Sequence, residues 1–233
     1  MITLRPASAR GKTVLDWLDS RHGFSFGDYH DPAHMGFGPL RVINEDRVSP
    51  GAGFSTHGHR DMEIISYVLE GALEHKDSTG VGSTIRPGDV QIMSAGSGIR
   101  HSEFNHSKTQ PVHFLQIWIL PDRLGVPPRY DQKTLAPPKN GGRSRLIGSP
   151  DGRDGSIVIY QDVEVHDALL NAGDSVTHPL APGRESWVQV ARGVVEVNGE
   201  VARAGDGVAV EGEQSVVVTS REKGAQILLF DLP

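Results

Sequence analysis

Two parts of the chain repeat one pattern of strands and turns in the same order. Val68–Glu74 (VLEGALE) is matched by Val190–Glu196 (VARGVVE), and Arg86–Val90 (RPGDV) is matched by Arg203–Gly207 (RAGDG). Each half therefore has two strands joined at a glycine, followed by a turn that contains Gly. Chance reuse of such turns is the alternative, but it does not explain the shared order. The repeat predicts two copies of one β module.

Most of the chain carries the pattern of short β-strands. The segments between turns are rich in β-branched and aromatic residues and are bounded by Gly, Pro, Asn or Asp. Val112–Leu120 is apolar on both faces, which predicts a buried central strand. Asn198-Gly199 predicts a two-residue hairpin turn, whereas Val14–Leu18 suggests a short helix. The other expected strands are 40–43, 63–69, 72–75, 89–93, 156–165, 186–191, 194–197, 207–210, 215–219 and 227–230.

The stretch between the two repeats interrupts this pattern. Two Pro-Pro pairs and an Asn-Gly-Gly run fall between residues 125 and 150, which is typical of a connection between domains. We therefore expect an N-terminal domain at residues 1–130, a linker at 131–150 and a C-terminal domain at 151–233.

Composition restricts the class of protein. The 233 residues include no cysteine, so neither a disulfide framework nor a thiolate metal site is available. The net charge is −6 and no long basic run occurs, so we expect no direct contact with nucleic acid. The N-terminal segment lacks the apolar core of a signal peptide, and no stretch reaches the ~20 apolar residues of a membrane span. We expect a cytoplasmic monomer without membrane association.

Two dipeptide-spaced pairs offer side chains that bind metals. They are His57-Gly-His59 and His101-Ser-Glu103. Residues i and i+2 of a strand point to the same face, so each pair delivers two potential ligands to one side of a sheet. Three imidazoles and one carboxylate suit a divalent transition metal such as iron, manganese, nickel, copper or zinc. Glu63 lies four residues after His59 and could compete with Glu103, or else form a salt bridge.

The second half does not repeat this ligand set. Aligning Gly71 with Gly193 and Gly88 with Gly205 identifies the positions that correspond to the two pairs and to Glu63. A shift of one residue would bring in His178, which is still a single ligand. The C-terminal domain is therefore expected to keep the scaffold without the metal ligands. The aligned residues are Pro179, Ala181, Glu185, Val218 and Ser220.

The remaining histidines do not fit the ligand pattern. His106 has the wrong parity relative to His101 on a strand, and His113 lies in the expected central strand, where we expect it to be buried and hydrogen-bonded. The others have no partner at ligand spacing and are expected at the surface or in loops. They are His22, His30, His34, His75, His166 and His178.

The first half resembles the two cupin sequence motifs. The first motif is matched by His57-x-His59, Glu63 and Gly71. The second motif is present in altered form, and its last part starts at His101. More specifically, four segments resemble the pirin family, and in particular its bacterial members with quercetin 2,3-dioxygenase activity. These segments are Phe24–Phe26, Gly38–Asn44, His57–Gly71 and Pro87–Glu103. The resemblance covers nearly the whole chain and implies an all-β bicupin, with two jelly-roll barrels of which the second is degenerate.

The resemblance also implies a metal site and an activity. In the family, the metal ligands correspond to His57, His59, His101 and Glu103, and iron is the metal we expect. The implied enzyme is a metal-dependent dioxygenase in flavonoid degradation, which opens the heterocycle of flavonols such as quercetin with dioxygen and releases carbon monoxide. Glu103 is the candidate catalytic base, because a carboxylate at the metal can reach the proton of an incoming hydroxyl. The aromatic substrate needs apolar walls, for which the candidates are Phe37, Phe54, Met62, Met93 and Phe104.

Two other functions are compatible with the sequence. One is a pirin-like regulatory protein, whose affinity for a protein partner changes with the oxidation state of its metal. The other is a cupin enzyme that acts on a different small molecule, since one fold can host many reactions.

Overall fold

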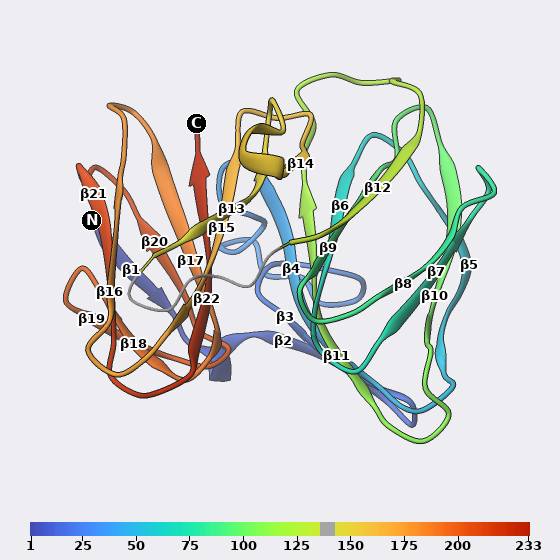
Figure 1. Ribbon diagram of the computed structural model, residues 1–233, viewed down its shortest axis with the longest axis horizontal. Helices are drawn as coiled ribbons and strands as arrows, with labels where there is room; N and C mark the ends of the chain where they lie inside the picture. The colour runs from blue at the N-terminus through green and yellow to red at the C-terminus, as the bar shows by residue number, and fades with distance from the viewer. Residues whose placement is uncertain (136–142) are drawn as a thin grey trace. The chain divides into compact units, whose positions relative to one another are not determined.

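The computed structural model describes residues 1–135 and 143–233, which fold almost entirely into antiparallel β-strands (Figure 1). They form two compact units, an N-terminal unit of residues 11–135 and 157–161, and a C-terminal unit of residues 1–10, 143–156 and 162–233. In the described part of the chain, no helix has the length and apolar character needed to cross a bilayer. The prediction of an all-β chain is confirmed.

The N-terminal unit holds two sheets. Its strands are β2 (Gly11–Leu15), β3 (Leu18–His22), β4 (Leu40–Val48), β5 (Gly53–His59), β6 (Glu63–Glu70), β7 (Leu73–Asp77), β8 (Gly82–Ile85), β9 (Asp89–Ser94), β10 (Ile99–Asn105), β11 (Val112–Ile119), β12 (Arg129–Thr134) and β14 (Ile157–Val158). The larger sheet has the order β12-β9-β6-β11-β4-β3-β2, and the smaller has the order β5-β10-β7-β8. The expected central strand, β11, indeed lies in the middle of the larger sheet.

The two sheets of this unit pack through a hydrophobic core. Leu73 and Ile85 from the smaller sheet lie in one buried cluster with Val68 and Phe114 from the larger sheet. Burial of these apolar side chains holds the sheets face to face, as in a β-sandwich or jelly roll. Any polar side chain on the inner faces is therefore held between two sheets rather than in solvent.

The C-terminal unit is built in the same way. Its elements are β1 (Ile2–Arg5), η1 (Ala7–Ala9), β13 (Arg145–Ser149), η2 (Arg153–Gly155), β15 (Glu164–Leu170), β16 (Ser175–Pro179), β17 (Glu185–Arg192), β18 (Val194–Val197), β19 (Glu200–Arg203), β20 (Gly207–Val210), β21 (Ser215–Ser220) and β22 (Ala225–Leu232). One sheet contains the order β1-β20-β17-β22-β15-β13, and the other has the order β16-β21-β18-β19.

The strand orders of the two units correspond element by element. The order β9-β6-β11-β4 matches β20-β17-β22-β15, and β5-β10-β7-β8 matches β16-β21-β18-β19. The repeated glycines also share one backbone conformation, with φ of 78° at Gly71 and 80° at Gly193, and 95° at Gly88 and 89° at Gly205. These left-handed values favour glycine, which explains why the turns keep it in both copies. The duplicated module predicted from the sequence is confirmed.

Two local predictions are wrong. The suggested helix at Val14–Leu18 is a hairpin instead, in which Leu15 pairs with Leu18 at the ends of β2 and β3. Pairing of β3 with β4 buries Leu18, and this tertiary contact outweighs the local pattern. The expected strand 156–165 is divided into β14 and the start of β15, because the backbone of Tyr160 hydrogen-bonds to the Glu63 carboxylate and to the amide of Asp122.

The predicted domain boundaries differ from the two compact units. Met1–Arg10 belongs to the C-terminal unit, because β1 pairs with β20. Residues 131–134 and 145–149 of the predicted linker lie in β12 and β13, which pair with β9 and β15. The centre of that linker, residues 136–142, lies outside the described residues.

Candidate metal centre

Three of the four predicted ligands come together on neighbouring strands. β5 and β10 pair antiparallel, with His101 opposite His57 and Ile99 opposite His59. Because side chains alternate along a strand, the three imidazoles share one face. Their ring centroids lie 4.8 Å apart for His57 and His59, 4.5 Å for His57 and His101, and 4.9 Å for His59 and His101. Their nearest ring nitrogens all lie within 4.8 Å of one another.

The ring nitrogens of this cluster are arranged to receive a metal ion. Nδ1 of His57 donates to the Ser55 carbonyl at 2.8 Å, which leaves Nε2 of His57 as an unprotonated acceptor. That Nε2 lies 3.1 Å from Nε2 of His101, and Nε2 of His59 is buried without a hydrogen-bond partner. Two imidazole nitrogens bound at right angles to one metal, at about 2.1 Å each, lie about 3.0 Å apart. The donor set therefore fits a divalent metal.

The surroundings keep two of these imidazoles, His59 and His101, neutral. Burial, together with the nearby His57, lowers the pKa of His59 to about 4. Burial and the neighbouring histidines lower the pKa of His101 to about 2. Neutral imidazole is the form that binds metals, so no proton has to be displaced from the rings of His59 and His101 near neutral pH.

The His101 ring also contacts a buried pair formed by His75 and Asp77. Nε2 of His75 lies 2.9 Å from the Asp77 carboxylate, and Nδ1 of His75 lies 3.4 Å from Nδ1 of His101. Both side chains of the His75–Asp77 pair are fully buried. Such carboxylate–histidine pairs orient a ligating ring and fix its tautomer. This role of His75 was not predicted from the sequence. His75 and Asp77 have the same two-residue spacing as the ligand pairs, and the pairing of β7 with β10 brings them beside His101.

We expect His75→Ala to weaken metal binding by about 10–100-fold, because the His101 ring loses its orienting partner. The measurement is the metal dissociation constant by competition with a chelator. His106→Ala is the matched control, since His106 is an exposed histidine that contacts Glu74. Equal affinities in His75→Ala and the wild type would contradict a supporting role.

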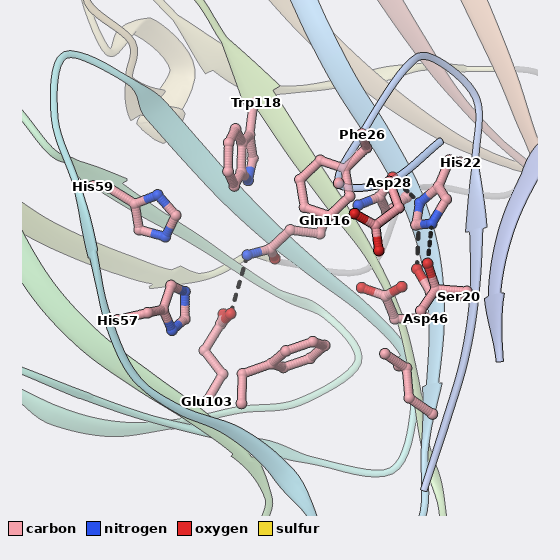
Figure 2. A pocket seen from close by; sticks show the side chains of 15 residues that line it. Ser20, His22, Phe26, Asp28, Asp46, His57, His59, Glu103, Gln116 and Trp118 are labelled. Carbon is pink, nitrogen blue, oxygen red and sulfur yellow. Dashed lines mark hydrogen bonds between the residues drawn. The ribbon is translucent and has the colours of Figure 1, made fainter. Parts of the chain in front are cut away.

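Glu103 lies beside His101 but is held by residues of the larger sheet. Its Oε2 accepts a hydrogen bond from the Gln116 amide at 3.1 Å (Figure 2). Its Oε1 accepts one from the Ser66 hydroxyl at 3.1 Å. Burial raises the pKa of Glu103 to about 7, against the lowering effect of these two hydrogen bonds. A carboxyl group with such a pKa exchanges its proton readily near neutrality.

The four predicted ligands do not form one equally tight group. Among the described residues, closely spaced ligand-type atoms form two groups of three, which share His101. One group is His57, His59 and His101, and the other is His75, His101 and Glu103. His101 thus connects the imidazole cluster to Glu103, and both groups lie in the N-terminal unit.

Glu63, the alternative carboxylate, is engaged elsewhere. Its Oε2 accepts hydrogen bonds from the Ser94 hydroxyl at 2.9 Å and from the Tyr160 amide at 3.1 Å, and it lies 3.8 Å from the Arg129 guanidinium. This is the salt-bridge role considered for Glu63 in the sequence analysis.

The other histidines differ partly from expectation. His113 is buried and pairs with Glu45 at 2.9 Å, as predicted. His22 and His75 are also buried, so the expectation of surface or loop positions was wrong for them. His166 and His178 lie in strands, with ring centroids 4.7 Å apart.

The C-terminal unit has other residues at the ligand positions. In the N-terminal unit, Ile99 pairs with His59. The equivalent residue of the C-terminal unit is Val216, which pairs with His178, so His178 occupies the position of His59. Val176 accordingly occupies the position of His57, which the alignment of the two sequence repeats had assigned to Pro179. His178 bonds instead to the Asp231 carboxylate at 2.7 Å.

A cavity of about 270 Å³ adjoins the imidazole cluster. His57, His59 and Glu103 lie at one side of it, whereas Ser20, His22 and Asp46 lie at the other (Figure 2). Aromatic and apolar side chains form much of the remaining wall. They are Leu18, Phe26, Phe54 and Trp118.

The sequence identified only one of these wall residues. Of the five candidates, Phe54 lines the cavity. Phe104 is 38% exposed, since its parity on β10 turns it away from His101 and Glu103. Met93 is buried in an apolar cluster with Ile64. Phe26 and Trp118 were missed because their positions depend on loop and sheet packing.

Asp46 is a buried carboxyl group at the far side of the cavity, and burial raises its pKa to about 7. In the unfolded chain the same group ionises near pH 4. Between these values the folded state binds more protons, so the stability contributed by this group falls as the pH rises from about 4 to about 7, and it stays at the lower level above that range. We expect Asp46→Asn to raise the melting temperature by a few degrees at pH 8 and by less at pH 5. An equal change at both pH values in thermal unfolding would contradict the raised pKa.

Comparison with known proteins places the chain in a family. The Pirin family model matches residues 3–119, and the model of the quercetinase C-terminal cupin domain matches residues 146–232. These matches confirm the expected bicupin architecture.

Individual relatives match over the full length. A protein of Escherichia coli K12 named quercetin 2,3-dioxygenase is 46% identical, over 100% of this chain and 99% of its own. The crystal structure of YhhW from Escherichia coli has a TM-score of 0.96 at 46% identity, and covers 100% of this chain and 98% of its own. A nickel(II) complex of YhhW, called a bacterial pirin, has a TM-score of 0.94 at the same identity, with 100% and 99% covered. The chain therefore belongs to the pirin family.

Proposed function

We propose that this protein is a metal-dependent dioxygenase that opens the heterocycle of flavonols such as quercetin. One observation carries the proposal: His57 and His59, two members of the cluster of three imidazoles, line a cavity with aromatic walls together with the buried carboxyl group of Glu103. Such a site can bind a metal and a flat aromatic molecule side by side. The name of the Escherichia coli relative, quercetin 2,3-dioxygenase, supports the substrate, and the nickel(II) complex of YhhW supports a divalent metal.

We propose His57, His59, His101 and Glu103 as the metal ligands and iron as the metal. Mixed imidazole and carboxylate sets with open positions are typical of non-haem iron oxygenases, although imidazole also suits nickel, copper and zinc. When bound, the metal supplies Lewis-acid stabilisation to the negative charge on the 3-oxygen of the flavonol.

Glu103 is the residue we propose as the general base. In the metal-free protein, burial raises the pKa of Glu103 to about 7, and a carboxylate at the metal can reach the proton of an incoming hydroxyl. Gln116 and Ser66 hold its two oxygens, so the carboxylate faces the substrate in one orientation. Glu103 would accept the proton of the 3-hydroxyl as the flavonol binds.

The walls of the cavity position the rings. Trp118, Phe26 and Phe54 present aromatic surfaces to the cavity, which can pack against the planar flavonol and exclude water. With the deprotonated flavonol held in this way, one flavonol and one dioxygen are converted to one depside and one carbon monoxide.

Oxygen uptake tests this proposal. Iron-loaded protein should consume dioxygen when quercetin is added, and protein stripped of metal by a chelator should not. Elemental analysis of the same samples shows whether uptake follows metal content. A metal-replete preparation that takes up no oxygen with any flavonol would rule out the proposed activity.

A further inference from the structure

The side of the cavity across from His57 and His59 is polar and deeply buried (Figure 2). It is formed by β3 and β4, whose register places Ser20 opposite Asp46 and His22 opposite Asn44. Ser20, His22, Asn44 and Asp46 are all buried. The cavity therefore has a polar group at each side and aromatic walls between them.

Most polar atoms of this region have partners within the protein. Nδ1 of His22 lies 2.9 Å from Oδ1 of Asn44, and Nε2 of His22 lies 2.9 Å from the Thr13 hydroxyl. Oδ1 of Asp46 is the exception, because it is buried and has no hydrogen-bond partner. A buried acceptor without a partner destabilises a fold unless something else donates to it. Asp46 is 3% exposed and lines the cavity, so a donor can come from a bound molecule.

The charges of the cavity restrict what that molecule can be. Its ionisable acids are Asp28, Asp46 and Glu103, and none of the described residues that line it is Lys or Arg. An anionic group, such as a carboxylate or a phosphate, would be repelled at the Asp46 side. A neutral hydroxyl group is a suitable donor, and a phenolic hydroxyl is one that lies in the plane of an aromatic ring.

We propose that Asp46 is a specificity residue, whose free carboxyl oxygen accepts a hydrogen bond from a phenolic hydroxyl on the part of the flavonol remote from the 3-oxygen. The preferred substrates are then polyhydroxylated flavonols rather than flavonols with the 3-hydroxyl alone. This inference rests on the proposed function, because it assumes that the 3-oxygen lies at the histidine cluster. Ser20 and the His22–Asn44 pair hold the strands around Asp46, and Asp46 alone makes the contact.

Two substrates separate this contact from the rest of the site. Quercetin has hydroxyl groups on its remote rings, whereas 3-hydroxyflavone has only the 3-hydroxyl. In the iron-loaded wild type at pH 8, where most of Asp46 is ionised despite its raised pKa, we expect KM for quercetin to be about 10-fold lower than for 3-hydroxyflavone, since a hydrogen bond to a charged group contributes about this much. Asp46→Ala should raise KM for quercetin about 10-fold, which is a much larger change than in KM for 3-hydroxyflavone.

Asp46→Asn provides a conservative comparison, because asparagine keeps one carbonyl oxygen at this position. It should retain the preference for quercetin to within about 3-fold of the wild type. Equal KM values for the two flavonols in the wild type, or equal effects of Asp46→Ala on both, would overturn this inference and leave the dioxygenase proposal intact. If the iron-loaded wild type turns over neither flavonol, the proposed function fails and this inference fails with it.

Discussion

His57→Ala is expected to lose bound metal and, with it, flavonol turnover. The variant removes the imidazole whose Nε2 lies 3.1 Å from Nε2 of His101, and whose Nδ1 is fixed by the Ser55 carbonyl. Removing a residue that only supports a ligand costs about 10–100-fold in metal affinity, so removal of a ligand should cost more than about 100-fold. Metal content after gel filtration and the rate of oxygen uptake measure the two effects.

The control for this variant is His106→Ala. It removes an exposed histidine of the loop that follows β10 and should keep both metal and activity. The melting temperature of metal-free His57→Ala should stay close to that of the metal-free wild type, because His57 is only partly buried. A His57→Ala protein that is folded, holds a full equivalent of metal and turns over quercetin normally would remove His57 from the ligand set.

Glu103→Gln is expected to keep most of the metal and to lose turnover by about 100-fold or more, which is the usual contribution of a general base. Glutamine preserves the size of the side chain and one carbonyl oxygen, but it cannot take up the proton of the 3-hydroxyl. The expected result is therefore a near-normal metal content with a reduced kcat.

Glu63→Gln is the matched control for the loss of a buried carboxylate. Glu63 lies in the same unit, but its hydrogen bonds go to Ser94 and Tyr160 rather than to the histidine cluster. We expect Glu63→Gln to retain turnover where Glu103→Gln does not. Full activity in Glu103→Gln would transfer the role of base to another group, such as Glu63 or water.

Local spacing was enough to predict much of this site. His57 and His59 are two residues apart, as are His101 and Glu103, and both pairs lie on strands as expected. The alternation of side chains along a strand depends on the backbone alone, so it can be read without knowing the fold. The turns at Gly71 and Gly193 also depend on the local backbone, since both need a left-handed conformation, and their repetition predicted the duplicated architecture.

Features that depend on pairing between distant strands could not be predicted in this way. His75 meets His101 only because β7 pairs with β10, and Asp46 reaches the cavity through the register of β3 and β4. The helix suggested at Val14–Leu18 is part of the hairpin of β2 and β3, whose position rests on the contact between β3 and β4. The wall residue Phe26 lies outside the named strands, where no periodic pattern applies.

The most direct test of the account is the stoichiometry of the reaction catalysed by the iron-loaded protein. Quercetin loss, dioxygen consumption and carbon monoxide release should be measured in one sealed vessel. We expect equal amounts of all three with the iron-loaded protein, and no reaction with protein stripped of metal. Quercetin that binds to the metal-loaded protein but is neither consumed nor accompanied by carbon monoxide would contradict it.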